Sequence, residues 1–166
     1  ILVNFKKSRP QSTLNVLQAG SVELRESLRQ RKCDLAFIRF ADEVDDDLVK
    51  IPYAADCMVA VLPAAHPLAK QTAIPLSSLA NEDFLMIEKG TYIYWLCYRA
   101  CQESGFEPKI AFTDHKVGIL VDLVTKGMGV ALLMKQLALY AAAPDTAIVD
   151  LSPCIATQIY LCYLKG

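Results

Sequence analysis

The chain has 166 residues, 54% of them hydrophobic, and a formal net charge of −1, which suits a globular protein of one domain or two small lobes. Lys135 interrupts the longest apolar stretch before it reaches the roughly 18 residues that a membrane span needs, so we expect no membrane contact through a transmembrane helix. A balanced charge is untypical of a surface that binds nucleic acid, so any contact with DNA is expected from residues outside this chain.

The six cysteines are expected to be reduced. Most lie in apolar stretches such as RKCDLAFI and IYLCYL, where cysteine behaves as a small hydrophobic residue. Cys97 and Cys101 are four residues apart, but without a CxxC motif or a nearby histidine they predict core packing and no metal. The first residues, ILVNFKKSRP, do not resemble a secretory signal. Together these features predict a cytoplasmic protein.

The first part of the chain predicts a strand, a helix and a second strand. Residues 12–19 and 33–40 are rich in β-forming side chains, and residues 21–32 between them carry leucines at helical spacing. The acidic segment at 41–50 lacks the glycine and the final glutamate of an EF-hand loop and is interpreted as a solvated connection. Two further apolar runs, LVKIPYA and CMVAVLP, lead to the segments HPLA and IPLSSLA.

The second part of the chain continues the alternation. DFLMIEKG predicts a strand, and TYIYWLCYRACQESG predicts a helix that Thr91 caps and Gly105 ends. KIAFTDH predicts the next strand, and the helix that begins near residue 115 has apolar residues on two sides. A strand VALLM, an alanine-rich helix and the strands AIVDL and ATQIYLCYL complete the chain. This order predicts an α/β fold of mostly parallel sheets with helices on both faces.

The glycine pair in LVTKGMGVALL has the spacing with which dinucleotide-binding loops begin. Such loops run from strand to glycines to helix, so that a phosphate meets the helix N-terminus. Here Gly127 follows a predicted helix, where a left-handed cap favours glycine and the helix dipole repels phosphate. The third small residue of the motif would fall at Leu132. The pair is therefore predicted to stop a helix and turn into a strand.

Sequence signatures of catalysis are not found. The chain has no GxSxG or GK[ST] motif, and its only histidines are His66 and His115. His66 precedes a proline in a predicted turn and is expected to make local hydrogen bonds. We therefore expect no catalytic residue, no cofactor and no enzyme activity.

Four segments in order resemble the effector-binding domain of LysR-type transcriptional regulators: FKKSRPQSTLNVLQAGSVELRESLRQRKCDLAFIR, LVKIPYAADCMVAVLPAAHPLA, SGFEPKIAF and LVTKGMGVALL. The corresponding family pattern is a helix ending in F and P, an extended run, a glycine, a helix, a DLA-type strand, the HPLA turn and a V-x-x-G-x-G-V helix stop. The resemblance covers essentially the whole chain, and four loose motifs in the right order make it fairly specific.

The resemblance implies two Rossmann-like lobes, similar to type 2 periplasmic binding proteins, with a small effector in the cleft between them. Two crossing strands would join the lobes at a hinge near Asp56 and Thr157. Residues 1–55 and 158–166 would then form lobe I, and residues 56–157 lobe II. The chain begins inside the family's first helix and stops before its last one, so lobe I is expected to be incomplete. The DNA-binding winged helix-turn-helix would lie outside this chain.

Effector-binding residues are expected where strands end and helices begin, because backbone amides and the positive helix terminus converge there on an anion. Three such ends supply the candidates: Arg39 and Phe40; Lys89, Gly90, Thr91 and Tyr92; and Thr113, Asp114 and His115. The alternatives remain open: an exposed loop arginine at the first end, a simple helix cap at the second and an N-cap cluster at the third.

The expected ligand is a small organic anion such as an aromatic acid. Arg39 would bind its carboxylate, and Phe40 and Tyr92 would offer flat apolar surface to a ring. In that role, replacement of Arg39 should leave the stability of the unliganded protein nearly unchanged.

The expected partner, besides the effector, is a second copy of the chain. Ile119 and Leu123 form the second apolar side of their helix and predict a homodimer interface, with a tetramer in the full-length protein. Two other functions stay open: a solute-binding protein of the same architecture and an enzyme on this fold. The residues that precede Ile1 would distinguish a regulator from a solute-binding protein.

Overall fold

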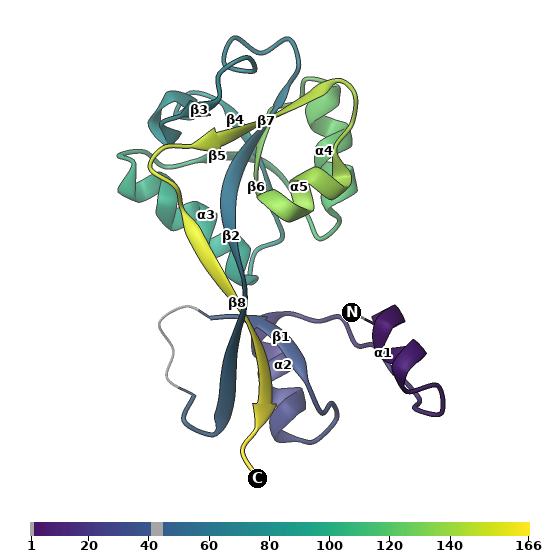
Figure 1. Ribbon diagram of the computed structural model, residues 1–166. Helices are drawn as coiled ribbons and strands as arrows, with labels where there is room; N and C mark the ends of the chain where they lie inside the picture. Colours follow the sequence, from purple (N-terminus) through teal and green to yellow (C-terminus); the bar gives the residue numbers. More distant parts are fainter. Residues whose placement is uncertain (1, 41–44) are drawn as a thin grey trace.

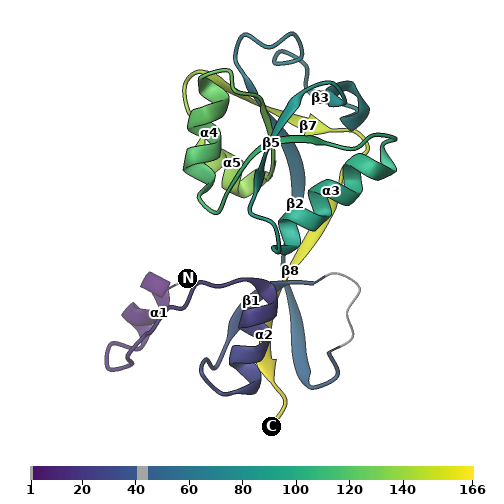
Figure 2. The same ribbon diagram turned by 180° about the vertical axis from the view of Figure 1, so that it is seen from behind.

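Two lobes of unequal size, joined by two long strands, make up the structure (Figure 1 and Figure 2). The computed structural model describes residues 2–40 and 45–166. Strands β2 (Leu48–Pro63) and β8 (Ala156–Leu164) run from one lobe into the other and pair with each other in antiparallel orientation. These two strands form the junction, as the crossing strands implied by the family resemblance would.

The small lobe contains helix α1 (Leu2–Ser8), helix α2 (Ser21–Arg29), strand β1 (Ala36–Arg39), the beginning of β2 and the end of β8. Helix α1 buries none of its residues and extends away from both lobes (Figure 1). The core of this lobe is one cluster of buried residues: Leu28, Ala36, Ile38, Leu48 and Cys162.

The large lobe holds the remaining elements. They are β3 (Ala73–Ile74), the 3-10 helix η1 (Leu76–Leu79), β4 (Asp83–Ile87), α3 (Tyr92–Glu103), β5 (Lys109–Asp114), α4 (Val117–Thr125), β6 (Val130–Met134), α5 (Lys135–Ala141) and β7 (Thr146–Leu151). Within the described ranges of both lobes, none of the helices is both long and apolar enough to cross a bilayer.

The strands form a mixed sheet in the order β1-β8-β2-β6-β4-β5, with β7 pairing with β2 and β3. Parallel pairs are β4 with β5, β4 with β6, and β3 with β7. Strand β2, in contrast, is antiparallel to β6, β7 and β8. The prediction of mostly parallel sheets was therefore wrong, because β2 runs away from the junction while β4 and β6 run toward it.

Helices cover both faces of the large-lobe sheet, as predicted. Alternate residues of β6 enter two separate cores, with Leu132 in one and Leu133 in the other. Helix α3 packs on the first face, and α4 and α5 pack on the second. This alternation follows from the two-residue period of a strand, which sends successive side chains to opposite faces.

One local prediction in the first part of the chain was wrong. Residues 12–19 form no strand: they are extended and lack a ladder partner among the described strands, and Val16 is 72% exposed. The apolar runs LVKIPYA and CMVAVLP join into the single strand β2, with a shift in register between Pro52 and Ala54. The shift lies beside Pro52, which has no backbone N–H for the ladder.

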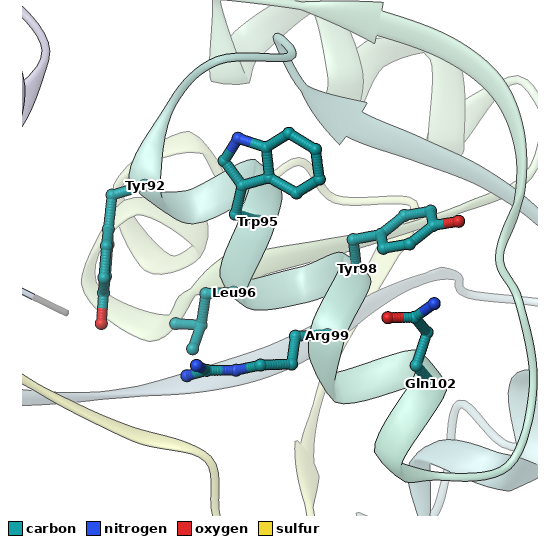
Figure 3. Close-up of a pocket in the computed structure, with 6 residues that line it drawn as sticks. All are labelled: Tyr92, Trp95, Leu96, Tyr98, Arg99 and Gln102. Carbon is teal, nitrogen blue, oxygen red and sulfur yellow. The ribbon is translucent and has the colours of Figure 1, made fainter. Parts of the chain in front are cut away.

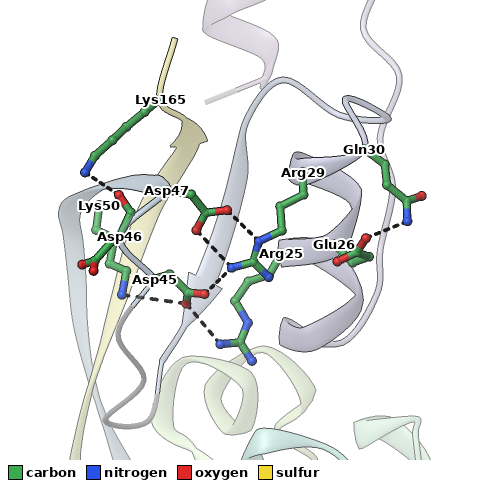
Figure 4. Close-up of polar contacts among 9 residues, drawn as sticks. All are labelled: Arg25, Glu26, Arg29, Gln30, Asp45, Asp46, Asp47, Lys50 and Lys165. Atoms are coloured by element: carbon green, nitrogen blue, oxygen red, sulfur yellow. Dashed lines mark hydrogen bonds and ion pairs between the residues drawn. The ribbon is translucent and has the colours of Figure 1, made fainter.

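An ion-pair network fastens α2 to the beginning of β2 (Figure 4). The Nε of Arg29 lies 2.7 Å from Asp47 Oδ2, and Asp45 accepts hydrogen bonds from Arg25 and Arg29. Of the acidic segment predicted to be solvated, residues 41–44 lie outside the described residues. The side chain of Asp45 is only 7% exposed, so this part of the prediction was wrong. The network connects two elements of a lobe whose apolar core is small.

The glycine pair stops α4, as predicted. Gly127 has φ +75° and donates its N–H to Val124 O at 2.9 Å, a left-handed helix end that glycine adopts without strain. At Gly129 the constraint is space, because a Cβ at this position would overlap the backbone carbonyl of Asp83 in β4. Because the glycines follow helix α4 and precede strand β6, this segment does not have the order of a phosphate-binding loop.

All six cysteines are free thiols, as predicted. Cys97, Cys101 and Cys162 are buried, and burial raises the pKa of Cys101 to about 12. Cys154, however, is exposed, so core packing does not describe every cysteine.

Candidate functional site

The ends of the large-lobe strands that carry the predicted binding residues face the junction. Met58 of β2, two residues beyond Asp56, pairs with Met134 at the end of β6, whereas Val61 pairs with Ala131 nearer its start. Strand β6 therefore runs toward the junction, and β4 and β5 run parallel to it. Their carboxyl ends, followed by α3 and α4, lie at this edge of the lobe, where open α/β sheets bind ligands.

Helix N-termini approach the junction from both lobes. Figure 2 shows α3 starting at the end of the large lobe nearest the junction, and α2 starting at the facing end of the small lobe. A helix N-terminus carries a partial positive charge and unpaired N–H groups. The two helices therefore favour a negatively charged group between the lobes.

The two predicted hinge residues lie opposite each other at the centre of the junction. Asp56 and Thr157 are register partners in β2 and β8 and are 5% and 7% exposed. One carboxylate oxygen of Asp56 accepts from the backbone N–H of Cys57 at 3.0 Å and from that of Gln136, at the start of α5, at 3.4 Å. Asp56 is thus a buried carboxylate fixed by the large lobe.

Arg39, the predicted carboxylate-binding residue, binds a carboxylate within the chain. Its guanidinium Nη2 donates to Asp56 Oδ2 at 2.9 Å, and its Nε donates to Thr157 Oγ1 at 3.3 Å. A buried carboxylate without its ionic partner is costly. This ion pair argues against the expectation that replacement of Arg39 would leave the stability of the unliganded protein nearly unchanged.

Phe40 contacts the small-lobe core. Its ring meets Tyr160 edge-on with centroids 5.8 Å apart, and the Lys50 ammonium lies 4.0 Å from its centroid. The ring is partly buried in this position. Only its remaining exposed surface is open to a ligand.

The segment before α3 has the geometry of a capped helix start. Thr91 Oγ1 accepts from the backbone N–H of Tyr94 at 3.2 Å and donates to Glu88 O at 2.9 Å. Gly90 has φ +97°, a conformation that a side chain disfavours. Lys89 is exposed at this end of the large lobe. The cap predicted at Thr91 is confirmed, and a ligand role for the segment stays a prediction.

The third candidate group begins α4. Asp114 Oδ1 accepts from the backbone N–H of Lys116 at 2.7 Å, so its side chain orders the start of the helix. His115 is exposed, with Nδ1 3.6 Å from the same carboxylate oxygen, and Thr113 is also exposed. The N-cap residue of α4 is Lys116, which makes no side-chain capping bond, so Asp114 orders the turn that leads into the helix. A ligand role for this group stays a prediction.

A shallow cavity of about 300 Å³ extends along α3, and sequence reasoning found only one of its lining residues. The lining residues are Tyr92, Trp95, Leu96, Tyr98, Arg99 and Gln102. In Figure 3 the guanidinium of Arg99 extends past Leu96 on the side of the helix where Tyr92 lies. Tyr92, Leu96 and Arg99 follow one another at intervals of four and three residues, so they share one face of the helix. This pattern could have identified Arg99 from the sequence. Arg99 is therefore a further cationic candidate, placed on the helix that begins at the junction.

His66 makes local hydrogen bonds in the large lobe. His66 Nδ1 accepts from the backbone N–H of Leu68 at 3.1 Å, and its Nε2 lies 3.2 Å from Glu82 Oε1, which confirms the predicted local hydrogen bonding. Across residues 2–40 and 45–166, no group of three or more histidine, cysteine or acidic side chains could hold a metal ion.

Comparison with known proteins gives one family. The model described as LysR substrate binding domain matches residues 1–166. The transcriptional dual regulator GltC of Bacillus subtilis is 28% identical over 133 residues, 80% of this chain and 44% of GltC. The HTH-type transcriptional regulator TtuA of Agrobacterium vitis is 27% identical over 140 residues, 83% of this chain and 46% of TtuA. The chain thus spans about half the length of the curated relatives it matches.

Solved structures of similar fold include two ligand complexes. The CcmR regulatory domain of Synechocystis PCC6803 in complex with 2-PG aligns with a TM-score of 0.88 and 21% identity, over 99% of this chain and 80% of that one. The BenM effector binding domain with its effector benzoate aligns with a TM-score of 0.85 and 17% identity, over 99% of this chain and 76% of that one. At these identities the likeness establishes the fold.

Proposed function

Because this chain belongs to the LysR-type transcriptional regulators through their substrate-binding domain, we propose that it is the cytoplasmic ligand-sensing domain of such a regulator. The observation that carries the proposal is the convergence of α2 and α3 on the junction from opposite lobes, at the carboxyl ends of β4 and β5. Contact with DNA is assigned to the part of the full-length protein outside this chain. The function is regulatory, without catalysis.

The proposed ligand is a small organic anion, such as an aromatic acid, bound between the lobes. Benzoate, the effector bound to the related BenM domain, is an anion of this type. Arg39 and Phe40 would contact it from the small lobe, Lys89 to Tyr92 from the start of α3, and Thr113 to His115 from the start of α4. A carboxylate satisfies both a cation and the N–H groups of a helix N-terminus.

At this site Asp56 and a ligand carboxylate would compete for the guanidinium of Arg39. In the unliganded protein its guanidinium is paired with Asp56. A ligand carboxylate that binds Arg39 either shares the guanidinium with Asp56 or displaces it, and so changes the contacts at the hinge pair Asp56 and Thr157. A ligand biases such an arrangement only through its different affinities for the two lobe orientations.

Calorimetric titration with a panel of carboxylates and matched neutral amides tests the proposal. Lys89→Ala is the informative variant, because Lys89 is exposed and its loss should not affect folding. We expect affinity for the best carboxylate to fall about tenfold, the scale of one charge-assisted hydrogen bond. The matched control is Lys126→Ala, which removes an exposed lysine that pairs with Asp122 at the opposite end of α4. Tight binding of the amides in place of the acids would refute the anion assignment.

We also propose that the full-length regulator is a homodimer, or a tetramer built from such dimers. Ile119 on α4 is 39% exposed and lies beside the half-buried Leu123, and α1 exposes Val3 and Phe5 to solvent. The apolar side of α4 would pack against α1 of a second copy and bury both surfaces.

Sedimentation of the full-length protein tests the dimer. The double variant Ile119→Glu, Leu123→Glu should be monomeric, because an interface core does not tolerate unpaired charge. Val22→Glu on α2 is the control: Val22 is 68% exposed but lies outside the proposed interface. A double variant that sediments like the wild type would exclude α4 from the interface.

A further inference from the structure

Two cysteine side chains meet on the large-lobe side of the junction. Cys57 follows Asp56 in β2 and is the register partner of Ala156, and Cys154 lies two residues before Ala156 in the loop that leads into β8. The backbone N–H of Met58 donates to Ile155 O at 2.9 Å and holds this loop against β2. Residues two apart in an extended segment point to the same side, which brings Cys154 toward Cys57. The two thiols lie within electrostatic range of each other, because Cys154 has the largest influence on the pKa of Cys57.

The two thiols differ in access to solvent. Cys154 is exposed and Cys57 is partly buried. The interaction with Cys154, followed by burial, raises the pKa of Cys57, so Cys57 is a thiol at neutral pH. An external oxidant therefore reaches Cys154 first, and Cys57 is placed to react with the oxidised sulfur of Cys154.

A cation lies close to both sulfurs. Lys135, the first residue of α5, interacts electrostatically with Cys57 and with Cys154. Its ammonium is also held by the Asp150 carboxylate, with Nζ to oxygen distances of 2.7 and 2.9 Å. A neighbouring cation favours the thiolate, which is the nucleophilic form of cysteine.

We propose that Cys57 and Cys154 form a redox-active dithiol that hydroperoxides oxidise to a disulfide. The Cys154 thiolate attacks one peroxide oxygen, the O–O bond breaks, and the departing oxygen leaves as water after taking up a proton, so that a sulfenic acid remains. The sulfur of Cys57, having lost its proton, then attacks the sulfur of Cys154 and releases the second water. In sum, two thiols and one hydrogen peroxide give one disulfide and two waters.

The disulfide would add a covalent link beside the hinge. It would connect β2, one residue from Asp56, to the loop that enters β8. Both crossing strands would then be tied together on the large-lobe side, where the bond from Met58 to Ile155 and the β2–β8 ladder already join them.

The remaining cysteines supply internal controls. Cys97 and Cys101 are also neighbours, four residues apart in α3, but both are buried, and burial raises the pKa of each. Proximity alone would predict oxidation of both pairs. Proximity combined with solvent access predicts oxidation of Cys57 and Cys154 only.

Stepwise titration of the reduced protein with hydrogen peroxide tests the proposal. Remaining thiols are alkylated at each step, and the intact mass and the tryptic peptides are measured. We expect loss of two hydrogens and one cross-linked species that joins the peptides of Cys57 and Cys154, reversed by dithiothreitol. Cys33→Ser should leave this species unchanged, and Cys57→Ser should instead accumulate sulfenic acid or a higher oxide at Cys154.

The wild-type peptide map decides the outcome even if a variant folds poorly. Cross-linking of Cys97 to Cys101 at equal or lower peroxide concentration would overturn the proposal. Oxidation of Cys154 to sulfinic acid in the wild type, without a bond to Cys57, would do so as well.

Discussion

The large lobe buries apolar residues on both faces of its sheet, whereas the small lobe buries them on one face. All five residues of β6 in the large lobe are buried. In the small lobe, β1 alternates, with Ile38 at 1% exposure and Phe37 at 44%. A sheet covered on one face has half the apolar contact available to hold it.

The two lobes are therefore stabilised by different kinds of contact. The large lobe is held by two hydrophobic clusters, one on each side of the sheet. The small lobe adds polar contacts to a single small cluster: the arginine–aspartate network on α2 and the contact of Arg39 with Asp56. We therefore expect lower protection against amide hydrogen exchange in α2 and β1 than in β6.

Matched leucine truncations should give the largest effect and the sharpest test of the comparison. Leu132 and Leu28 are 0% and 1% exposed, in the large and the small lobe. We expect Leu132→Ala to lower the free energy of unfolding by about 4 kcal/mol and Leu28→Ala by about 2, because a small cluster near the surface relaxes around a cavity more easily. Chemical denaturation followed by circular dichroism measures both values.

The two truncations should also differ in which elements lose protection against hydrogen exchange. Hydrogen exchange should show Leu28→Ala opening α2 and β1 while β6 stays protected. Equal loss of protection in both lobes would mean that they unfold as one unit, and the distinction between them would fail.

Arg39→Ala should have the next largest effect, because it removes the ionic contact between the small lobe and Asp56. We expect a loss of about 2 kcal/mol in unfolding free energy, since the Asp56 carboxylate stays buried without its cation. The double variant Arg39→Ala, Asp56→Asn should recover part of this loss, because the remaining side chain is neutral. A double variant that is less stable than the single one would show that the pair is not the source of the effect.

Acid should have the smallest effect, confined to the small lobe. The hydrogen bond from Arg29 is the main cause that keeps the pKa of Asp47 below its usual value. At Asp45, burial opposes the charged form, but the hydrogen bonds from Arg25 and Arg29 outweigh it, so its pKa is also lowered. A lowered pKa means that the ion pairs stabilise the fold at neutral pH and progressively lose this effect as the pH falls below about 4.

Exchange protection factors of α2, compared at pH 6 and at pH 3.5, test this prediction. At the lower pH the protection should fall in α2 and stay unchanged in α4. Arg29→Gln should lower the protection of α2 already at pH 6, and so reduce the difference in protection between the two pH values. Loss of protection in α4 to the same degree would place the acid-sensitive groups elsewhere.

The elements whose signals are local could be predicted from the amino-acid sequence. The strand, helix, strand order from β4 to β6 follows from apolar periodicity, from the cap at Thr91 and from the helix stop at Gly127. These signals act between residues a few positions apart, so they do not depend on the rest of the fold. For the same reason the order of the motifs was sufficient to indicate the family and its α/β fold.

Contacts between residues of distant segments could not be predicted in this way. Residues 12–19 have strand propensity but no ladder partner among the described strands, and a strand needs a neighbour for its hydrogen bonds. Arg39 reaches Thr157, 118 residues further along the chain, and so contacts the junction of β2 and β8 as well as being a candidate ligand residue. Cys57 meets Cys154 in the same way. Such contacts depend on how β2 and β8 cross, and no local pattern in the sequence records the position at which two strands align.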